Sequence, residues 1–138
     1  MAELMNVEVV AADRRVWEGT ATLVIVRTTE GDVGILPRHE PLLAALVPCA
    51  AEIVSTDGRR EIIALEGGFL SVAQNRVSLL SQYATVADDI SVERARRELS
   101  HLQTLHTDGK ATEDEVHRMH LFEAQLVAAE KVQALESK

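Results

Sequence analysis

The sequence predicts a mainly β protein of the α+β class. An antiparallel sandwich or barrel of eight to ten short strands comes first, and a two-helix antiparallel hairpin follows. Residues 1–87 hold 17 of the 22 valines and isoleucines, six of the seven glycines and all three prolines, a composition typical of strands and turns. Residues 88–138 hold 18 charged residues and no proline, which favours helices. A length of 138 residues suits one domain with a small appendage. We therefore place the domain boundary at residue 87.

Alternation of apolar and polar side chains locates the first strands. Residues 7–11 carry apolar side chains at every second position, and a turn near residues 13–15 precedes a second strand over 16–19. Such alternation is the period of a half-buried strand. The segment 22–27 is apolar at both parities, which predicts a strand that is covered on both faces.

Turn dipeptides locate the later strands. Asp57-Gly58 is a strong hairpin signal, and Gly67-Gly68 and Asn75-Arg76 mark two further turns. So many short strands without intervening helices favour an antiparallel sandwich or barrel over a parallel α/β fold. The expected strands of this part are 51–54, 61–65, 69–72 and 77–80.

Two helices are expected after residue 87. Ser91 is a candidate N-cap for the first, and Gly109 can adopt the left-handed conformation that ends it. Thr112 and Glu115 have the spacing of a capping box at the start of the second helix. Each helix has a single apolar stripe, which must cover the other helix, the β domain or a partner. The stripe of the second helix comprises Val116, Met119, Phe122, Leu126, Ala129, Val132 and Leu135.

Composition excludes several classes of protein. The net charge is -8, with 14 basic and 22 acidic residues and few aromatic side chains, which argues against a nucleic-acid partner. The single cysteine, Cys49, excludes an intrachain disulfide and is expected to be a small buried side chain. No apolar run approaches the ~20 residues that span a bilayer. The first residues lack a signal-peptide pattern, so a cytosolic location is expected.

The sequence shows no enzymatic site. No HExxH, GxSxG, P-loop or dinucleotide motif is present, so no catalytic residue, metal site or resident cofactor is expected. Four histidines lie near the turn of the helical hairpin. We expect them to be solvated or paired, with a weak metal site or a pH-sensing role as the alternative. They are His101, His106, His117 and His120. From the residues alone, the chain is a binding or coupling module.

The segment 31–43 is unusual for a β domain. Pro37 and Pro41 cannot lie inside a central sheet, because neither donates a backbone hydrogen bond. The segment must therefore run along an edge or a loop. It also carries four large apolar residues, which are either packed beneath a bend or presented to a partner. They are Ile35, Leu36, Leu42 and Leu43.

At this segment the chain resembles the epsilon subunit of bacterial F-type ATP synthases. The stretch GDVGILPRHEPLLAAL at 31–46 is similar to that family's most recognisable motif, and GGFLSV at 67–72 is similar to its second. The similarity continues through DISVERA at 89–95 into the helical hairpin. It therefore covers essentially the whole chain, with both parts in the family's order.

The resemblance implies a ten-stranded β-sandwich followed by two helices. It implies a non-catalytic central-stalk subunit that couples proton flow to ATP synthesis, peripheral on the cytoplasmic face of the bacterial cell membrane. The partners would be the gamma subunit and the c subunits of the rotor ring. The loop around Asp32 would meet the ring, and the proline-containing stretch would border gamma and the ring. The implied partner-binding residues are Asp32, Ile35, Pro37, His39, Pro41, Leu42 and Leu43.

The resemblance also implies a regulatory role for the helical hairpin. In this family the hairpin can extend toward the beta subunits and inhibit ATP hydrolysis, and in some members the folded hairpin binds ATP. An ATP-binding sensor is thus the alternative function. Ser91 replaces the acidic residue of the nucleotide motif, so weak or absent ATP binding is expected. The second helix mixes acidic and basic residues, so at most moderate inhibition is expected. The residues of a weak nucleotide site would be Ile90, Arg94, Ala95 and Arg97.

Overall fold

The structure, a computed structural model, describes residues 3–136. Ten strands precede a 3-10 turn (η1, Ala87–Asp89) and two helices, α1 (Val92–Thr107) and α2 (Glu113–Glu136). The predicted boundary at residue 87 lies between the last strand and α1, and the mobility of the hairpin stays a prediction. The strands are β1 (Met5–Val10), β2 (Arg15–Ala21), β3 (Leu23–Thr28), β4 (Gly31–Ile35), β5 (Leu42–Leu46), β6 (Cys49–Val54), β7 (Arg60–Leu65), β8 (Gly68–Ala73), β9 (Arg76–Leu80) and β10 (Ala84–Val86).

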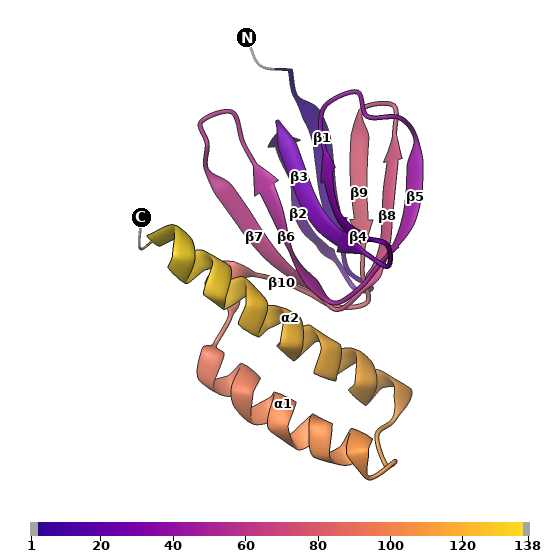
Figure 1. Cartoon of the computed structure of the whole chain (residues 1–138), viewed down its shortest axis with the longest axis vertical. Coiled ribbons are helices and arrows are strands. Elements are labelled where there is room, and N and C mark those ends of the chain that lie inside the picture. Colours follow the sequence, from indigo (N-terminus) through magenta and orange to yellow (C-terminus); the bar gives the residue numbers. More distant parts are fainter. Residues whose placement is uncertain (1–2, 137–138) are drawn as a thin grey trace.

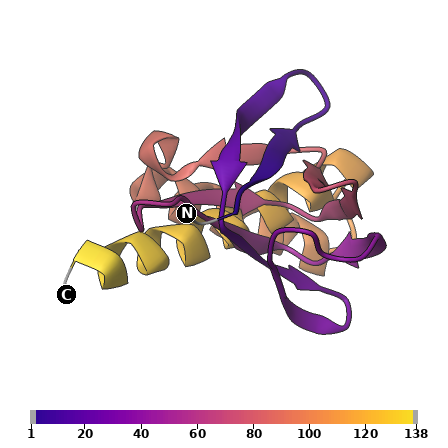
Figure 2. The same cartoon turned by 90° about the horizontal axis from the view of Figure 1, so that it is seen from above.

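The strands form a curled sheet above the helical hairpin (Figure 1). Their order is β10-β7-β6-β3-β5-β8-β9-β1-β2, and β4 pairs with β3. Contacts between β10 and β2 bring the two ends of this order together, so the sheet encloses a core (Figure 2). The expected ten-stranded sandwich is therefore confirmed.

One strand pair differs from the antiparallel prediction. β1 and β9 pair in parallel, with Val7 opposite Val77. The two strands are far apart in sequence, so no tight turn dictates their relative direction. The other pairings between strands are antiparallel.

Alternating side chains fill the interior of the sandwich. Val7 and Val9 of β1 are buried, as predicted. On β3, Val24 and Val26 face the core, whereas Leu23 and Ile25 on the opposite face are half-buried. Burial of this apolar surface is the main stabilising contribution to the domain.

The predicted helix ends are confirmed. The Ser91 Oγ accepts a hydrogen bond from the Arg94 N–H (3.3 Å), and Gly109 has φ 71°. The Thr112 Oγ1 accepts from the Glu115 N–H (3.1 Å), while the Glu115 Oε1 accepts from the Thr112 N–H (3.0 Å). These contacts satisfy amide donors that the helices leave free at their starts.

Helix α2 packs through two apolar faces. Met119 and Phe122 belong to the predicted stripe and pack against α1. A second face, with Leu121, Ala124 and Ala128, lies against β6 and β7. Helix α2 thus lies between the sheet and α1 (Figure 1). Within residues 3–136, no helix has the length and hydropathy needed to cross a bilayer.

Candidate subunit interface

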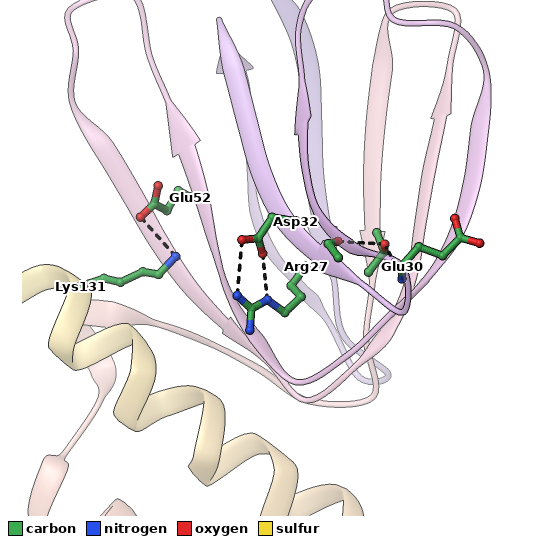
Figure 3. Close-up of polar contacts among 7 residues, drawn as sticks. Arg27, Glu30, Asp32, Glu52 and Lys131 are labelled. Atoms are coloured by element: carbon green, nitrogen blue, oxygen red, sulfur yellow. Dashed lines mark hydrogen bonds and ion pairs between the residues drawn. The ribbon is translucent and has the colours of Figure 1, made fainter.

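The β3–β4 hairpin carries an ion pair on the side that faces α2. The Arg27 Nε donates to the Asp32 Oδ1 (2.8 Å) and its Nη2 to the Asp32 Oδ2 (3.4 Å), a two-pronged contact (Figure 3). Hydrogen bonding and charge from Arg27 lower the pKa of Asp32. Both side chains are exposed, so the pair orients the hairpin and contributes little stability.

Thr28 closes the turn of this hairpin. Its hydroxyl donates to the Gly31 carbonyl (3.0 Å) and accepts from the Glu30 N–H (3.1 Å). Gly31 has φ 114°, which a glycine adopts readily. Figure 3 shows Glu30 at the tip, pointing away from Arg27 and Asp32. The turn therefore presents the Glu30 carboxylate outward, while the Asp32 carboxylate stays paired with Arg27. In the sequence, the hydroxyl residue Thr28 three positions before Gly31 is the feature from which this turn could have been predicted.

Residues 36–41, which we call the proline rim, join β4 to β5 at the end of the sandwich away from the helices (Figure 1). The His39 N–H donates to the Leu36 carbonyl (3.1 Å), and Arg38 has φ 65°. The Asn75 side chain accepts from the Arg38 N–H (2.9 Å) and donates to the Leu4 carbonyl (2.8 Å). One asparagine in the β8–β9 turn therefore anchors the rim to the rest of the sheet.

An exposed apolar surface lies on the outer face of β5, β8 and β9. Leu43 is 75% exposed, Phe69 55% and Leu80 42%. Phe69 lies directly opposite Ala45 on one side and Leu80 on the other, so these side chains share one face. We call Leu43, Ala45, Phe69 and Leu80 the apolar strip. Large side chains grouped in this way mark an interaction surface.

The structure divides the predicted partner-binding residues among three places. Asp32, near the start of β4, lies on the side that faces α2 (Figure 3), whereas the proline rim follows the end of β4. The rim holds Pro37, His39 and Pro41, of which Pro41 is exposed. Leu43 belongs to the apolar strip, next to the rim in sequence. The predicted partner-binding residues therefore do not form a single patch on the surface.

Two predicted contact residues point inward. Ile35 is fully buried in the core, so its assignment as a partner contact is wrong; it supports the rim from within. Leu42 is half-buried and packs on the same core. Strand alternation explains both, because Ile35 follows the exposed Gly34 on β4 and Leu42 precedes the exposed Leu43 on β5. The same alternation at Phe69 and Leu70 could have revealed the strip from the sequence.

A groove of about 700 Å³ opens beside the strip, between the sandwich and the start of α2. Phe69 and Leu80 line it from the sheet, and His117 and His120 line it from α2. Glu66 also lines the groove and is 5% exposed. The groove is therefore apolar on the sheet side and carries titratable groups on the helix side.

The residues expected to hold a nucleotide do not converge in the folded hairpin. Ala95 is fully buried between α1 and α2, so its assignment as a nucleotide contact is wrong for this arrangement. Arg94 and Arg97 are exposed, and Ile90 packs near Tyr83 and Ala87. The buried contact of Ala95 instead holds the two helices together.

The four hairpin histidines have different surroundings. His101 and His106 are exposed on α1, and the His117 Nδ1 lies 2.9 Å from the Glu66 Oε2. In the part of the chain described, no cluster of three or more His, Cys, Asp or Glu could hold a metal ion. Cys49 is buried, as expected, and burial raises the pKa of its thiol.

A comparison with family models identifies this fold. The model described as "ATP synthase, Delta/Epsilon chain, beta-sandwich domain" matches residues 4–87. The chain belongs to the ATP synthase delta/epsilon family. The match covers all ten strands, including those that carry the apolar strip and the proline rim.

Relatives within the delta/epsilon family extend the match into the hairpin. The ATP synthase epsilon chain of Cutibacterium acnes is 48% identical over 133 residues, covering 91% of each chain. The ATP synthase epsilon chain of Streptomyces avermitilis is 47% identical over 112 residues, covering 81% of this chain and 88% of its own.

Solved structures show the same fold at lower identity. A chain in the Euglena gracilis mitochondrial ATP synthase (OSCP, F1 and c-ring, rotational state 1) aligns with a TM-score of 0.66 and 22% identity, covering 99% of this chain and 82% of that one. A chain in the Tetrahymena thermophila mitochondrial ATP synthase (central stalk and c-ring) gives 0.50 and 12%, covering 78% and 96%.

Proposed function

We propose that this delta/epsilon-family chain is a non-catalytic central-stalk subunit that couples proton flow to ATP synthesis. In this role the apolar strip binds the gamma subunit, and the β3–β4 hairpin and proline rim border the c subunits of the rotor ring. The observation that carries the proposal is the exposed strip on three adjacent strands. The epsilon-chain relatives and the c-ring assemblies that contain similar folds support it.

The strip fits a permanent subunit contact. Leu43 and Phe69 project from paired strands of a closed sheet, so their backbone is already ordered before a partner covers them and the entropy cost of binding is low. Fully burying a large apolar side chain contributes about 1.5–3 kcal/mol. A rigid sandwich held through such anchors can transmit rotation without deforming.

The negative net charge of the chain indicates which partner surfaces would attract it. Residues 1–87 and 88–138 each carry 7 basic and 11 acidic residues, so both parts are acidic. An acidic subunit is steered toward basic surfaces on its partners. The epsilon-chain relatives, rather than the charge, support our proposal that the chain is a peripheral subunit on the cytoplasmic face of the bacterial membrane.

The helical hairpin supplies regulation in this proposal. When α2 leaves β6 and β7, the hairpin can extend toward the beta subunits and restrain ATP hydrolysis. Helix α2 carries Glu123 and Glu130 beside Arg118 and Lys131, so it is not a basic rod suited to an acidic surface. Inhibition is therefore moderate at most.

The alternative of an ATP sensor is less well supported. Ala95 is buried by the helix pairing, and Ser91, which replaces the acidic residue of the nucleotide motif, caps α1. Arg94 and Arg97 are available to a phosphate only from the solvent side. We therefore propose that the folded hairpin binds ATP weakly or not at all.

Copurification with gamma tests the main proposal. Leu43→Asp places a charge at the most exposed residue of the strip, so gamma capture should fall at least tenfold, because an unpaired charge in an apolar contact is costly. Leu43 is 75% exposed, so the variant should fold. Val127→Asp is the matched control, since Val127 is 42% exposed on α2, and it should leave capture unchanged. Normal capture by Leu43→Asp would place the gamma contact elsewhere.

A further inference from the structure

A buried carboxylate links the sandwich to the hairpin. Glu66, in the β7–β8 turn, is 5% exposed. Its Oε1 accepts a hydrogen bond from the Gln82 N–H (3.1 Å), and its Oε2 lies 2.9 Å from the His117 Nδ1. His117 is on α2, so one oxygen is satisfied by the β domain and the other by the hairpin. Docking of α2 therefore determines whether this carboxylate has its second partner.

The rest of the docked interface consists mainly of small or singly bonded side chains, with Leu121 as the large buried residue that α2 contributes. Ala124 and Ala128 pack on Ala50, Ile62 and Ala64. Three polar contacts supplement them: Gln125 donates to Thr85 (3.1 Å), Lys131 pairs with Glu52 (3.4 Å), and Tyr83 donates to Asp114. Leu121 and Ile62 are the large buried apolar side chains of this interface and its polar contacts are few, so the loss of one charged contact can shift the equilibrium between docked and released hairpin.

The groups around His117 favour its charged form. Glu66 faces it from the β7–β8 turn, and Glu113 and Asp114 face it from the first turn of α2. The Gln82–Tyr83 segment contributes the Tyr83 hydroxyl, which is bonded to Asp114, and His120 lines the same groove. The hydrogen bond to Glu66, followed by the charges of these carboxylates, raises the pKa of His117.

We infer that the His117–Glu66 contact is a pH-sensitive latch: protonated His117 holds the hairpin on the sandwich, and loss of the proton favours its release. This inference rests on the mobility of the hairpin in the proposed function. Neutral His117 can still donate one hydrogen bond, but it loses the charge-assisted part of the contact. Once α2 departs, water can reach Glu66 and solvate it.

The direction of the effect follows from linkage. The contribution of Glu66, the largest cause of the raised pKa of His117, exists only while α2 is docked. In the released hairpin this pKa therefore falls toward its ordinary value near 6.5, while Glu113 and Asp114 stay beside His117 on α2. A group with a raised pKa in the docked form stabilises that form fully below its ordinary pKa. The stabilisation is lost as the pH rises through the raised value. Release is therefore an alkaline event, beginning above about pH 6.5.

Energy transfer in the full-length chain tests the latch. A Cys49→Ala background removes the native thiol, and dyes are attached at Arg59→Cys in the β6–β7 turn and Gln133→Cys near the end of α2, both exposed positions. The released, low-transfer population should rise severalfold between about pH 6 and pH 8.5, because deprotonation removes the charge-assisted part of a contact whose histidine is partly exposed.

Two variants identify the group responsible. His117→Gln keeps a hydrogen-bonding side chain without a titration near neutrality, so its released population should be independent of pH. His106→Gln, at the exposed end of α1, is the matched control and should behave as the unmodified chain does. Glu66→Gln should also remove the pH dependence, and thermal melting of each variant checks that the β domain is folded.

Three results would overturn the latch: a released population that does not change with pH, the same pH dependence in His117→Gln, or no released population at any pH. The last result would also refute hairpin mobility. Gamma capture is tested at Leu43, which does not line the groove that holds Glu66 and His117, so a failure of the latch and a failure of the gamma contact are separate results.

Discussion

Gly68 is a position at which the sandwich has no room for a side chain. It opens β8 with φ 101°, and a Cβ built there would lie 1.9 Å from the Leu80 carbonyl oxygen. That close approach brings β9 against the start of β8, where Phe69 and Leu80 form part of the apolar strip. Gly68 thus allows the close approach of β8 and β9, the two strands that carry Phe69 and Leu80 of the apolar strip.

Gly68→Ala should destabilise the chain by about 3 kcal/mol, because the strained backbone and the clash with strand β9 add together. Chemical denaturation measures this change in the free energy of unfolding. Gly58→Ala is the matched control: Gly58 also has a positive φ, 83°, but open space surrounds it, so only about 1–2 kcal/mol should be lost. Equal losses in the two variants would show that the close approach is unimportant.

At the scale of elements, α2 joins the two parts of the molecule. Its Met119–Phe122 face holds α1, and its Ala124–Ala128 face holds the sheet. The alanines let the helix lie close to β6 and β7, and Leu121 is the large side chain that α2 buries in this contact. Helix α2 is therefore the element whose packing determines where the hairpin lies.

Ala128→Leu should weaken the docking of α2. Ala128 is fully buried against the sheet, and extra carbon atoms in a close-packed contact cost about 1–3 kcal/mol. Hydrogen exchange at β6 and β7 should accelerate in the variant, because the sheet loses its cover. Gln133→Leu, an exposed position on the same helix, should leave exchange unchanged. Unchanged exchange in Ala128→Leu would mean that the interface is looser than its packing indicates.

The sequence predicted features that depend on neighbouring residues. The alternation in β1, the capping box at Thr112 and the left-handed Gly109 are local, and each is confirmed. The parallel pairing of β1 with β9 and the second apolar face of α2 depend on long-range contacts, which no local pattern specifies. The family resemblance implied that Ile35 contacts a partner, whereas strand alternation turns its side chain into the core.

At the scale of the whole molecule, the candidate partner-binding surfaces and the surface that the hairpin covers lie on different strands. The apolar strip and proline rim lie on the sandwich, and the hairpin packs against β6 and β7 (Figures 1 and 2). The strip is exposed while the hairpin is docked. In the proposed function, gamma binding and movement of the hairpin can therefore occur together, with the sandwich fixed on the stalk.

The most direct test of this account is ATP-driven proton pumping by the complete ATP synthase reconstituted in vesicles. We predict that a complex assembled with Leu43→Asp plus Phe69→Asp loses most of its pumping relative to ATP hydrolysis, and that adding the unmodified chain restores it. The matched control, Val127→Asp, should pump normally. Normal pumping with the double variant would contradict the claim that the apolar strip couples this chain to gamma.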